Sequence, residues 1–217
     1  MADLTLVYMT NSKLPDKWVR HHKKVLLDAA GNYPIISFSR TPIDIGENHL
    51  QTEPESKRNI FYQILKGVRL AKTKYIATVE DDVLYHNSHF EMRSNKILYN
   101  VNKWSLYTWN PVYNLKNWIR TQATMIAPRE LVLEILEKRF KKEITDQTIG
   151  EIGVFDGIKV EEFKSHVPII QLDHDFFTPF DRERETIKRR HKKELGSMQA
   201  LDIPYWGKSQ DLIKYFL

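Results

Sequence analysis

The stretch YIATVEDD, residues 75–82, joins a short apolar run to three consecutive acids. The run is β-branched and aromatic, which is typical of a buried strand, and the acids follow where such a strand would end. Side chains alternate along extended backbone, so Glu80 and Asp82 should point to one side and Asp81 to the other. At most two of the three acids are therefore expected to face one ligand directly.

The sequence before this stretch alternates between strand and helix patterns. Residues 4–9 and 35–38 have the composition of buried strands, and apolar residues recur at helical spacing after Pro15 and again after Ser56, which can cap a helix. The polar segment 40–55, with its prolines and glycine, is predicted to be a loop. The resulting β-α-β-α-β order predicts an α/β fold with a mainly parallel central sheet flanked by helices, whose ligands bind outside the carboxyl ends of the strands.

Further elements are expected in the rest of the chain. Residues 105–109, 122–126 and 167–172 have strand character, and residues 131–140 have helical periodicity. Pro168 lacks an N–H group, which places the last of these strands partly at an edge. No repeat, low-complexity tract or linker divides the 217 residues, so one domain spanning 1–217 is predicted.

The composition is that of a globular protein, with 41% apolar and 12% aromatic residues. There is no cysteine, which excludes disulfides and thiolate metal sites, so any metal must bind oxygen or imidazole. No apolar window is long enough for a membrane span and no export signal is recognised, so a cytoplasmic location is expected. The net charge of +5 weakly favours polyanionic partners.

Three acids at the end of a buried strand repel one another unless a cation neutralises them. Carboxylate oxygens suit Mn²⁺ or Mg²⁺, which complete their coordination with waters and substrate phosphates. Glu80, Asp81 and Asp82 therefore point to a metal site that binds a nucleoside diphosphate. The alternative is an ordinary acidic surface turn.

The sequence TVEDDV of residues 78–83, followed by Phe90, resembles the Glu-Asp-Asp form of the DXD motif in inverting GT-A glycosyltransferases. The similarity is greatest to the N-acetylglucosaminyltransferases of the eukaryotic Golgi, and it covers about residues 4–92. Those enzymes are longer and carry a membrane anchor and stem, so a compact bacterial or viral relative fits better. The resemblance implies a single GT-A (Rossmann-like) domain, with a nucleotide-sugar-binding half at about 1–100 and an acceptor half at about 101–217.

The resemblance also implies roles for residues of the first half. Asp82 would bind the metal that bridges the donor diphosphate, and Glu80 and Asp81 would contact the ribose or order the metal's waters. The donor would be a nucleotide sugar, expected to be a UDP-sugar. Further donor contacts would come from Arg58, in the helix that begins SKRNI at Ser56, and from loop atoms at Thr10 and Asn11.

Inverting transfer needs a carboxylate that takes the proton of the acceptor hydroxyl. Glu151 and Asp156 lie in a glycine-containing segment of the second half, where backbone can approach a ligand closely, and Asp156 is preferred. Related enzymes often use a late histidine as a further metal ligand, which makes His174 the candidate, with His86 and His89 as weaker options. Each of these histidines can instead be a hydrogen-bonded structural residue.

Two sets of later residues are candidates for substrate contacts. Basic residues between 182 and 190 could cover the diphosphate or hold a polyanionic acceptor. Aromatic rings could stack on sugars or bases, or belong to the core; these are Trp104, Tyr107, Trp109, Tyr113 and Trp118.

Other functions remain open. The chain has no glycine-rich turn after its first strand and no phosphate-binding Gly-Lys-Ser/Thr loop, which excludes dinucleotide-binding oxidoreductases and P-loop proteins. A metal-dependent nucleotidyltransferase or nuclease, and a non-catalytic nucleotide or nucleic-acid binding module, are the alternatives. For a glycosyltransferase, the acceptor is expected to be either envelope glycan or DNA with hydroxymethylated pyrimidines, as in phage DNA modification.

Overall fold

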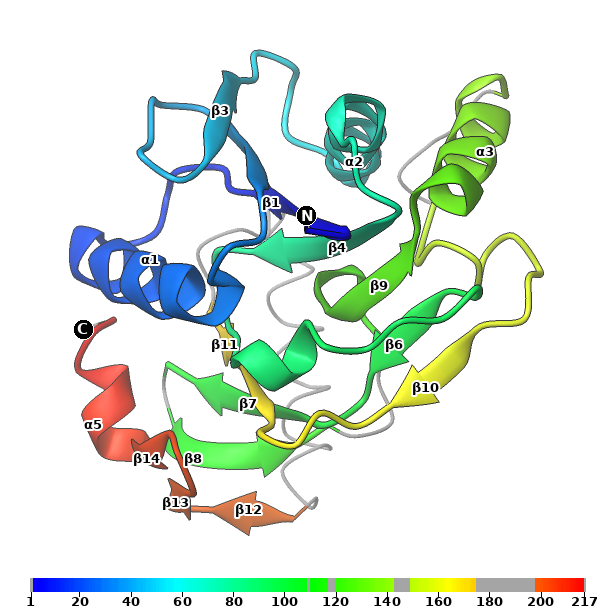
Figure 1. The fold of residues 1–217 in the computed structure, drawn as a ribbon. Helices are drawn as coiled ribbons and strands as arrows, with labels where there is room; N and C mark the ends of the chain where they lie inside the picture. The colour runs from blue at the N-terminus through cyan, green and yellow to red at the C-terminus, as the bar shows by residue number, and fades with distance from the viewer. Residues whose placement is uncertain (1, 109, 117–119, 143–148, 175–197, 217) are drawn as a thin grey trace.

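The computed structural model describes residues 2–108, 110–116, 120–142, 149–174 and 198–216 (Figure 1). Trp109, Trp118 and the basic residues between 182 and 190 lie outside these ranges. In the described part of the chain, none of the helices has the length and apolar character needed to cross a bilayer.

A mixed central sheet organises the fold. Within the described residues it has seven strands in the order β10-β6-β9-β4-β1-β2-β3. The strands are β1 (Leu4–Met9), β2 (Ile35–Ser39), β3 (Glu47–Leu50), β4 (Tyr75–Glu80), β6 (Leu98–Asn100), β9 (Met125–Pro128) and β10 (Glu161–Phe163). β3, β2, β1 and β4 are parallel, whereas β9 runs antiparallel to its neighbours β4 and β6. The α/β fold class predicted from the sequence is confirmed.

The order in which the chain adds strands to the sheet changes direction at β1. It adds β2 and β3 on one side of β1, and β4 then pairs with the other side of β1, with Met9 opposite Glu80. In parallel sheets such a switch point opens a crevice outside the carboxyl ends of the two strands. Thr10 and Asp81 follow directly at these ends.

Helices cover both faces of the central sheet (Figure 1). They are α1 (Asp16–Ala30), α2 (Lys57–Leu70) and α3 (Arg129–Phe140). Alternate residues of β1 serve the two faces: Leu6 packs in the cluster that includes Leu26 of α1, and Val7 packs in the cluster that includes Ile64 of α2. This alternation explains why β1 is an unbroken apolar run, since a strand buried on both faces needs apolar side chains on each.

A second sheet lies beside the first. Its order among the described residues is β12-β8-β7-β11-β5. The strands are β5 (Val83–Leu84), β7 (Lys103–Tyr107), β8 (Asn110–Leu115), β11 (Ile169–Asp173) and β12 (Gln199–Ala200). The remaining short elements are η1 (Asn87–His89), η2 (Gln122–Thr124), β13 (Asp202–Ile203), β14 (Gly207–Lys208) and α5 (Ser209–Ile213). Leu84, Leu172 and Ile213 share a third cluster with Trp18 of α1, so α1 also packs against this sheet.

Three local predictions from the sequence were wrong. The expected loop at 40–55 contains the edge strand β3, which lacks apolar alternation and is held instead by Asn48 Nδ2, 2.9 Å from both Ser37 Oγ and Ser39 Oγ. The strand expected at 122–126 is η2 followed by β9. β11 lies between β7 and β5 rather than at an edge, because Pro168 precedes its first residue and needs no ladder N–H.

Candidate functional site

The acids Glu80, Asp81 and Asp82 form the turn between the two sheets. β4 of the central sheet ends at Glu80, and β5 of the second sheet begins at Val83. We call residues 80–82 the acid turn. It lies at the switch point of the sheet, the strand end at which the sequence predicts a ligand site.

Helix α1 holds the backbone of the acid turn. Trp18 Nε1 donates to the Asp81 carbonyl at 2.8 Å, and His22 Nε2 lies 3.1 Å from the Glu80 carbonyl and 3.0 Å from that of Val83. Residues four apart share one side of a helix, so both rings reach the turn. Both partners of His22 Nε2 only accept, so this nitrogen carries the proton. Burial lowers the pKa of His22 to about 4, which keeps the ring neutral.

Two further contacts complete this support. The Glu80 N–H donates to Tyr85 Oη at 3.2 Å, and that hydroxyl donates to the Ala123 carbonyl at 2.9 Å. The Leu172 N–H donates to the Asp82 carbonyl at 2.7 Å. Because these hydrogen bonds fix its backbone, the acid turn holds its three carboxylates in defined positions.

Asp81 faces the end of β1. Its carboxylate accepts a hydrogen bond from the Thr10 hydroxyl, whose oxygen accepts from the Ser12 N–H at 2.9 Å. Burial raises the pKa of Asp81 to about 6, and the hydrogen bond from Thr10 opposes that rise. Thr10 and Asp81 were both predicted to be donor-binding residues, and the structure brings them into direct contact.

Glu80 is the last residue of β4, and Asp82 directly precedes β5 of the second sheet. Burial raises the pKa of Glu80 to about 7, helped by the charge of Asp81 and opposed by that of Lys103. Burial also raises the pKa of Asp82 well above its usual range, with contributions from Glu80 and Asp81. Among the described residues, Asp82 Oδ1 is buried and has no hydrogen-bond partner. A buried carboxylate oxygen without a partner is unfavourable unless a ligand completes it.

Lys103 is a site residue that the sequence did not reveal. It is the first residue of β7 and only 2% exposed. Its Nζ donates to Gln171 Oε1 at 3.0 Å and lies 3.5 Å from Thr121 Oγ1. Burial lowers its pKa to about 8, against the opposing charges of Asp173, Asp82 and Glu80. No spacing in the sequence links residue 103 to the acid turn, because the second sheet brings them together.

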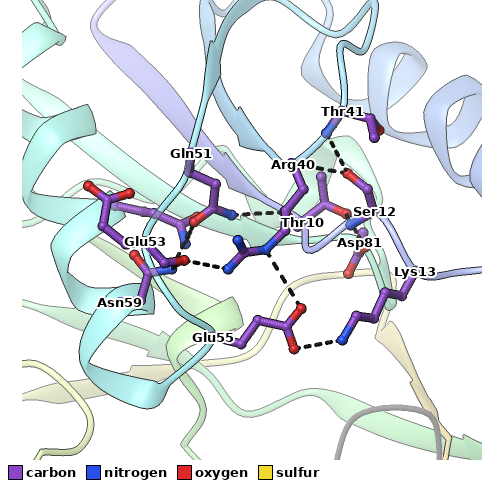
Figure 2. A network of polar contacts seen from close by, with 11 residues as sticks. Thr10, Ser12, Lys13, Arg40, Thr41, Gln51, Glu53, Glu55, Asn59 and Asp81 are labelled. Carbon is purple, nitrogen blue, oxygen red and sulfur yellow. Dashed lines mark hydrogen bonds and ion pairs between the residues drawn. The ribbon is translucent and has the colours of Figure 1, made fainter.

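A network of polar side chains also surrounds the carboxyl end of β1 (Figure 2). Gln51 Nε2 donates to the Thr10 carbonyl at 3.2 Å, and Asn59 Nδ2 of α2 donates to Gln51 Oε1 at 2.8 Å. Arg40, which follows β2, donates from Nη2 to the Glu53 carbonyl at 2.6 Å, and its Nε lies 3.6 Å from Glu55 Oε1. These contacts place a cation and several polar groups beside Thr10.

The chain turns sharply after β1. Ser12 has a φ of 60°, which is uncommon for a residue other than glycine, and its hydroxyl accepts from the Arg40 N–H at 3.2 Å. Asn11 lies between Thr10 and Ser12 and is partly exposed. Strained backbone of this kind often marks a ligand-contacting loop.

Arg58 lies apart from the network around Thr10. Its guanidinium is stacked over the Phe140 ring of α3, with Cζ 5.4 Å from the ring centre, whereas the neighbouring Asn59 reaches Gln51. The structure therefore brings Arg40, rather than Arg58, into the polar network of Figure 2.

The two predicted base residues have different surroundings. Asp156 accepts from Arg139 Nε at 2.7 Å and Nη2 at 2.6 Å, and from the Gly153 N–H at 2.7 Å. These contacts fix the 150–157 loop against α3. Glu151 instead acts on the acid turn, since its charge contributes to the raised pKa of Glu80. Asp156 is therefore held by Arg139 of α3, whereas the charge of Glu151 acts on Glu80.

The candidate histidines occupy three settings. His174 follows β11 directly, and its ring stacks on Phe216 with 5.8 Å between ring centres. His89 is buried, contacts Asn100 Nδ2 at 3.0 Å through Nδ1, and has its pKa lowered to about 3 by burial. His86 caps η1, where Nδ1 accepts from the Ser88 N–H at 3.2 Å. His89 and His86 thus have structural contacts, and His174 stays the predicted ligand that follows a strand of the second sheet.

The aromatic candidates within the described ranges belong to the core. Tyr107 and Tyr113 are buried, and Trp104 packs against the cluster of the second sheet. The buried rings of Tyr107 and Tyr113 are therefore not available for stacking on a substrate, whereas Trp104 is only partly buried.

The donor set of the acid turn fits a hard divalent cation. Within the described residues there is no group of three or more His, Asp or Glu side chains arranged around a common metal position. Mg²⁺ and Mn²⁺ do not need one, because they bind through one or two carboxylates together with waters and substrate phosphates. The partnerless Asp82 Oδ1 provides such a ligand, and the charge of Glu80 acts on the same carboxyl group.

No protein-family model and no curated protein matches the chain. Among solved structures, similarity is found to a glycosyltransferase involved in glycosylation of the major capsid of PBCV-1, with 10% identity, TM-score 0.49, and coverage of 87% of this chain and 100% of the other. A nucleotidyl transferase from Methanothermobacter thermautotroptrophicus has 12% identity, TM-score 0.48 and coverages of 77% and 89%. The bifunctional IspDF of Campylobacter jejuni has 9% identity and TM-score 0.43, over 76% of this chain and 50% of that protein, so the chain spans half of its length. At these identities and scores, the similarities assign neither a family nor an activity.

Proposed function

We propose that this chain is a metal-dependent glycosyltransferase of the GT-A type, which moves a sugar from a nucleotide sugar to a hydroxyl acceptor. The observation that supports it best is the buried, partnerless Oδ1 of Asp82 on a rigid turn at the switch point of the sheet. The resemblance of residues 78–83 to the DXD motif specifies the substrate class as a nucleotide sugar, with UDP-sugar as the expected donor.

Asp82, with Glu80 beside it, would hold Mn²⁺ or Mg²⁺ at this position. When bound, the ion neutralises the charge that develops on the departing diphosphate. His174 is the proposed additional ligand from the second sheet. Asp81 does not turn toward Asp82 but is held by Thr10, which suits it to a hydroxyl of the donor ribose.

The nucleoside would lie along the end of β1. Thr10, Asn11 and Ser12 form the turn there, and Arg40 offers a cation within the same network. We therefore add Arg40 to Arg58 as a donor-binding candidate. Figure 2 shows Thr10, Ser12 and Arg40 near Asp81.

We assign the general base to Glu151. In an inverting transfer, the acceptor oxygen forms a bond to the sugar's anomeric carbon while the bond from that carbon to the diphosphate breaks, and the hydroxyl proton passes to the base. Asp156 is less suited because Arg139 binds both of its carboxylate oxygens. The charge of Glu151 acts on Glu80, which supports this assignment.

Release of UDP from a panel of UDP-sugars, measured with Mn²⁺ and with a chelator, tests this function. The wild-type protein should hydrolyse at least one donor only when Mn²⁺ is present, and Asp82→Asn should lower that rate by roughly 100-fold or more. Asp44→Asn is the matched control, because Asp44 is an exposed acid paired with Lys23. Its rate should equal that of the wild type.

Two results would contradict the proposal. One is an Asp82→Asn protein that is folded and as active as the wild type. The other is turnover of nucleoside triphosphates without turnover of any nucleotide sugar, which would favour a nucleotidyltransferase. Once a donor is known, transfer to envelope glycan and to hydroxymethylated DNA distinguishes the two proposed acceptors, and a steep salt dependence of binding would favour DNA.

A further inference from the structure

Two basic side chains share one carboxylate near the carboxyl ends of β1 and β2. Lys13 follows β1 and Arg40 follows β2, and we call them the cation pair. Lys13 Nζ donates to Glu55 Oε2 at 2.7 Å, and Arg40 Nε lies 3.6 Å from Glu55 Oε1. Each oxygen of one carboxylate therefore faces one cation, as Figure 2 shows.

Contacts other than Glu55 also hold the cation pair together. The Arg40 N–H donates to the hydroxyl of Ser12, the residue directly before Lys13, at 3.2 Å. Arg40 Nη2 donates to the Glu53 carbonyl at 2.6 Å, which fixes the guanidinium. The loops after the two strands are thus joined through their backbone. The two cations would stay neighbours without Glu55, and an anion between them offsets their repulsion.

The carboxylate between the cations can be exchanged at low cost. The side chains of Lys13 and Glu55 are 48% and 42% exposed. Ion pairs this exposed add little to the stability of a fold, so opening them is not costly. A phosphate group also presents oxygens to two donors, and it carries more negative charge than one carboxylate. The carboxyl ends of parallel strands are also where ligands enter folds of this class.

We propose that the cation pair is a binding site for a phosphate group, and that Glu55 occupies this site until the ligand displaces it. The phosphate oxygens take the positions of the carboxylate oxygens at Lys13 and Arg40, and the Glu55 side chain turns to solvent. Glu55 therefore limits the affinity for the ligand. The anion site rests on the ion pairs alone, whereas its assignment to the phosphates of a nucleotide donor rests on the proposed function.

Calorimetric titration with inorganic pyrophosphate, in chelator, tests the site without metal or nucleotide. Glu55→Gln removes the competing charge and should bind pyrophosphate roughly three- to tenfold more tightly than the wild type. Adding Lys13→Met to this variant should weaken binding by about threefold or more, because one of the two cations is lost. Both effects should shrink when the salt concentration is raised from about 0.05 M to about 0.5 M.

Glu137→Gln is the matched control for the change in net charge. Glu137 of α3 is as exposed as Glu55, at 41%, and pairs with Arg69 Nη2 at 2.9 Å. Its replacement should leave the affinity for pyrophosphate within about twofold of the wild type, because the charge removed is not at the cation pair. Equal or weaker binding by Glu55→Gln, an equal gain in Glu137→Gln, or no binding by any of these proteins would overturn the proposal.

UDP and uridine separate this site from the proposed function. If the phosphates of a nucleotide bind here, Glu55→Gln should tighten the binding of UDP and leave that of uridine unchanged. An equal gain for both would overturn the assignment to the phosphates, since uridine has none. Tighter binding of pyrophosphate by Glu55→Gln, without binding of UDP by any of the proteins, would support the anion site and contradict the nucleotide donor of the proposed function.

Discussion

His22 donates one hydrogen to two carbonyl oxygens of the acid turn and its neighbour, those of Glu80 and Val83. Replacing it with Phe keeps an aromatic ring but removes the donor. Burying an unsatisfied carbonyl costs about 1–3 kcal/mol. We expect His22→Phe to lose stability in this range at pH 7.5, as measured by urea unfolding. An unchanged midpoint would show that the turn does not depend on this hydrogen bond.

His22 should also make the stability of the protein depend on pH. Burial lowers the pKa of His22 to about 4 in the folded protein, below its ordinary value of 6.5, so the unfolded chain binds the proton more readily between these values. The wild type should therefore lose stability as the pH falls from about 6.5 toward 4, and His22→Phe should lack this loss. The stability difference between the two proteins should narrow with falling pH. A constant difference would contradict the buried neutral ring.

At the scale of elements, α2 approaches β1 closely at Gly67. A Cβ placed there would lie 2.6 Å from Val7 Cγ1 and 3.2 Å from Phe38 Cε2. Alanine is favoured over glycine in a helix by about 1 kcal/mol, whereas overpacking a core costs about 1–3 kcal/mol. The contacts are to buried side chains on two strands of the central sheet, β1 and β2, so we expect overpacking to dominate. Gly67→Ala should lower the melting temperature, and a higher one would mean that the helix shifts freely on the sheet.

The elements that could be predicted from the sequence are those with strong periodicity. β1, α1, β2, α2 and β4 follow from apolar patterns, because each buries a regular face. β3 could not be predicted, since the Asn48 side chain and its serine partners stabilise it. β5 could not be predicted either, because a strand of two residues is too short to show a periodic pattern.

The residues of the candidate site also differ in whether the sequence could predict them. The acid turn could be located because consecutive acids after an apolar run are visible in the sequence. Lys103, Arg40 and the support from His22 depend on tertiary contacts between distant segments. The contact between Asp156, the preferred base, and Arg139 of α3 could not be predicted, because it depends on packing between segments.

At the scale of the whole molecule, the acid turn joins the two sheets and places unfavourable charge between them. Burial raises the pKa of Glu80 to about 7 and that of Asp81 to about 6, above their ordinary values of 4.5 and 3.8. Groups of this kind stabilise the fold at low pH and lose that contribution as the pH rises through the folded value. Their effect between about pH 4 and 7 is opposite in sign to that of His22.

Comparing the wild type with Glu80→Gln isolates the effect of the Glu80 carboxyl group on the pH dependence of stability. In chelator, the variant should match the wild type near pH 5, where Glu80 is protonated, and should be the more stable of the two at pH 7.5. Thermal unfolding across this range provides the measurement. A wild type that is the more stable protein at pH 7.5 would show that Lys103 outweighs the cost of burying the ionised carboxylate.

The proposed function requires that Asp82 binds a cation, which in turn binds the diphosphate of the donor. The two ligands must then strengthen each other's binding equally, because coupling between sites is reciprocal. Isothermal titration of UDP with and without Mn²⁺ measures this directly. We expect Mn²⁺ to tighten UDP binding by roughly tenfold or more in the wild type and to have little effect in Asp82→Asn. Equal UDP affinity with and without Mn²⁺ in the wild type would contradict it.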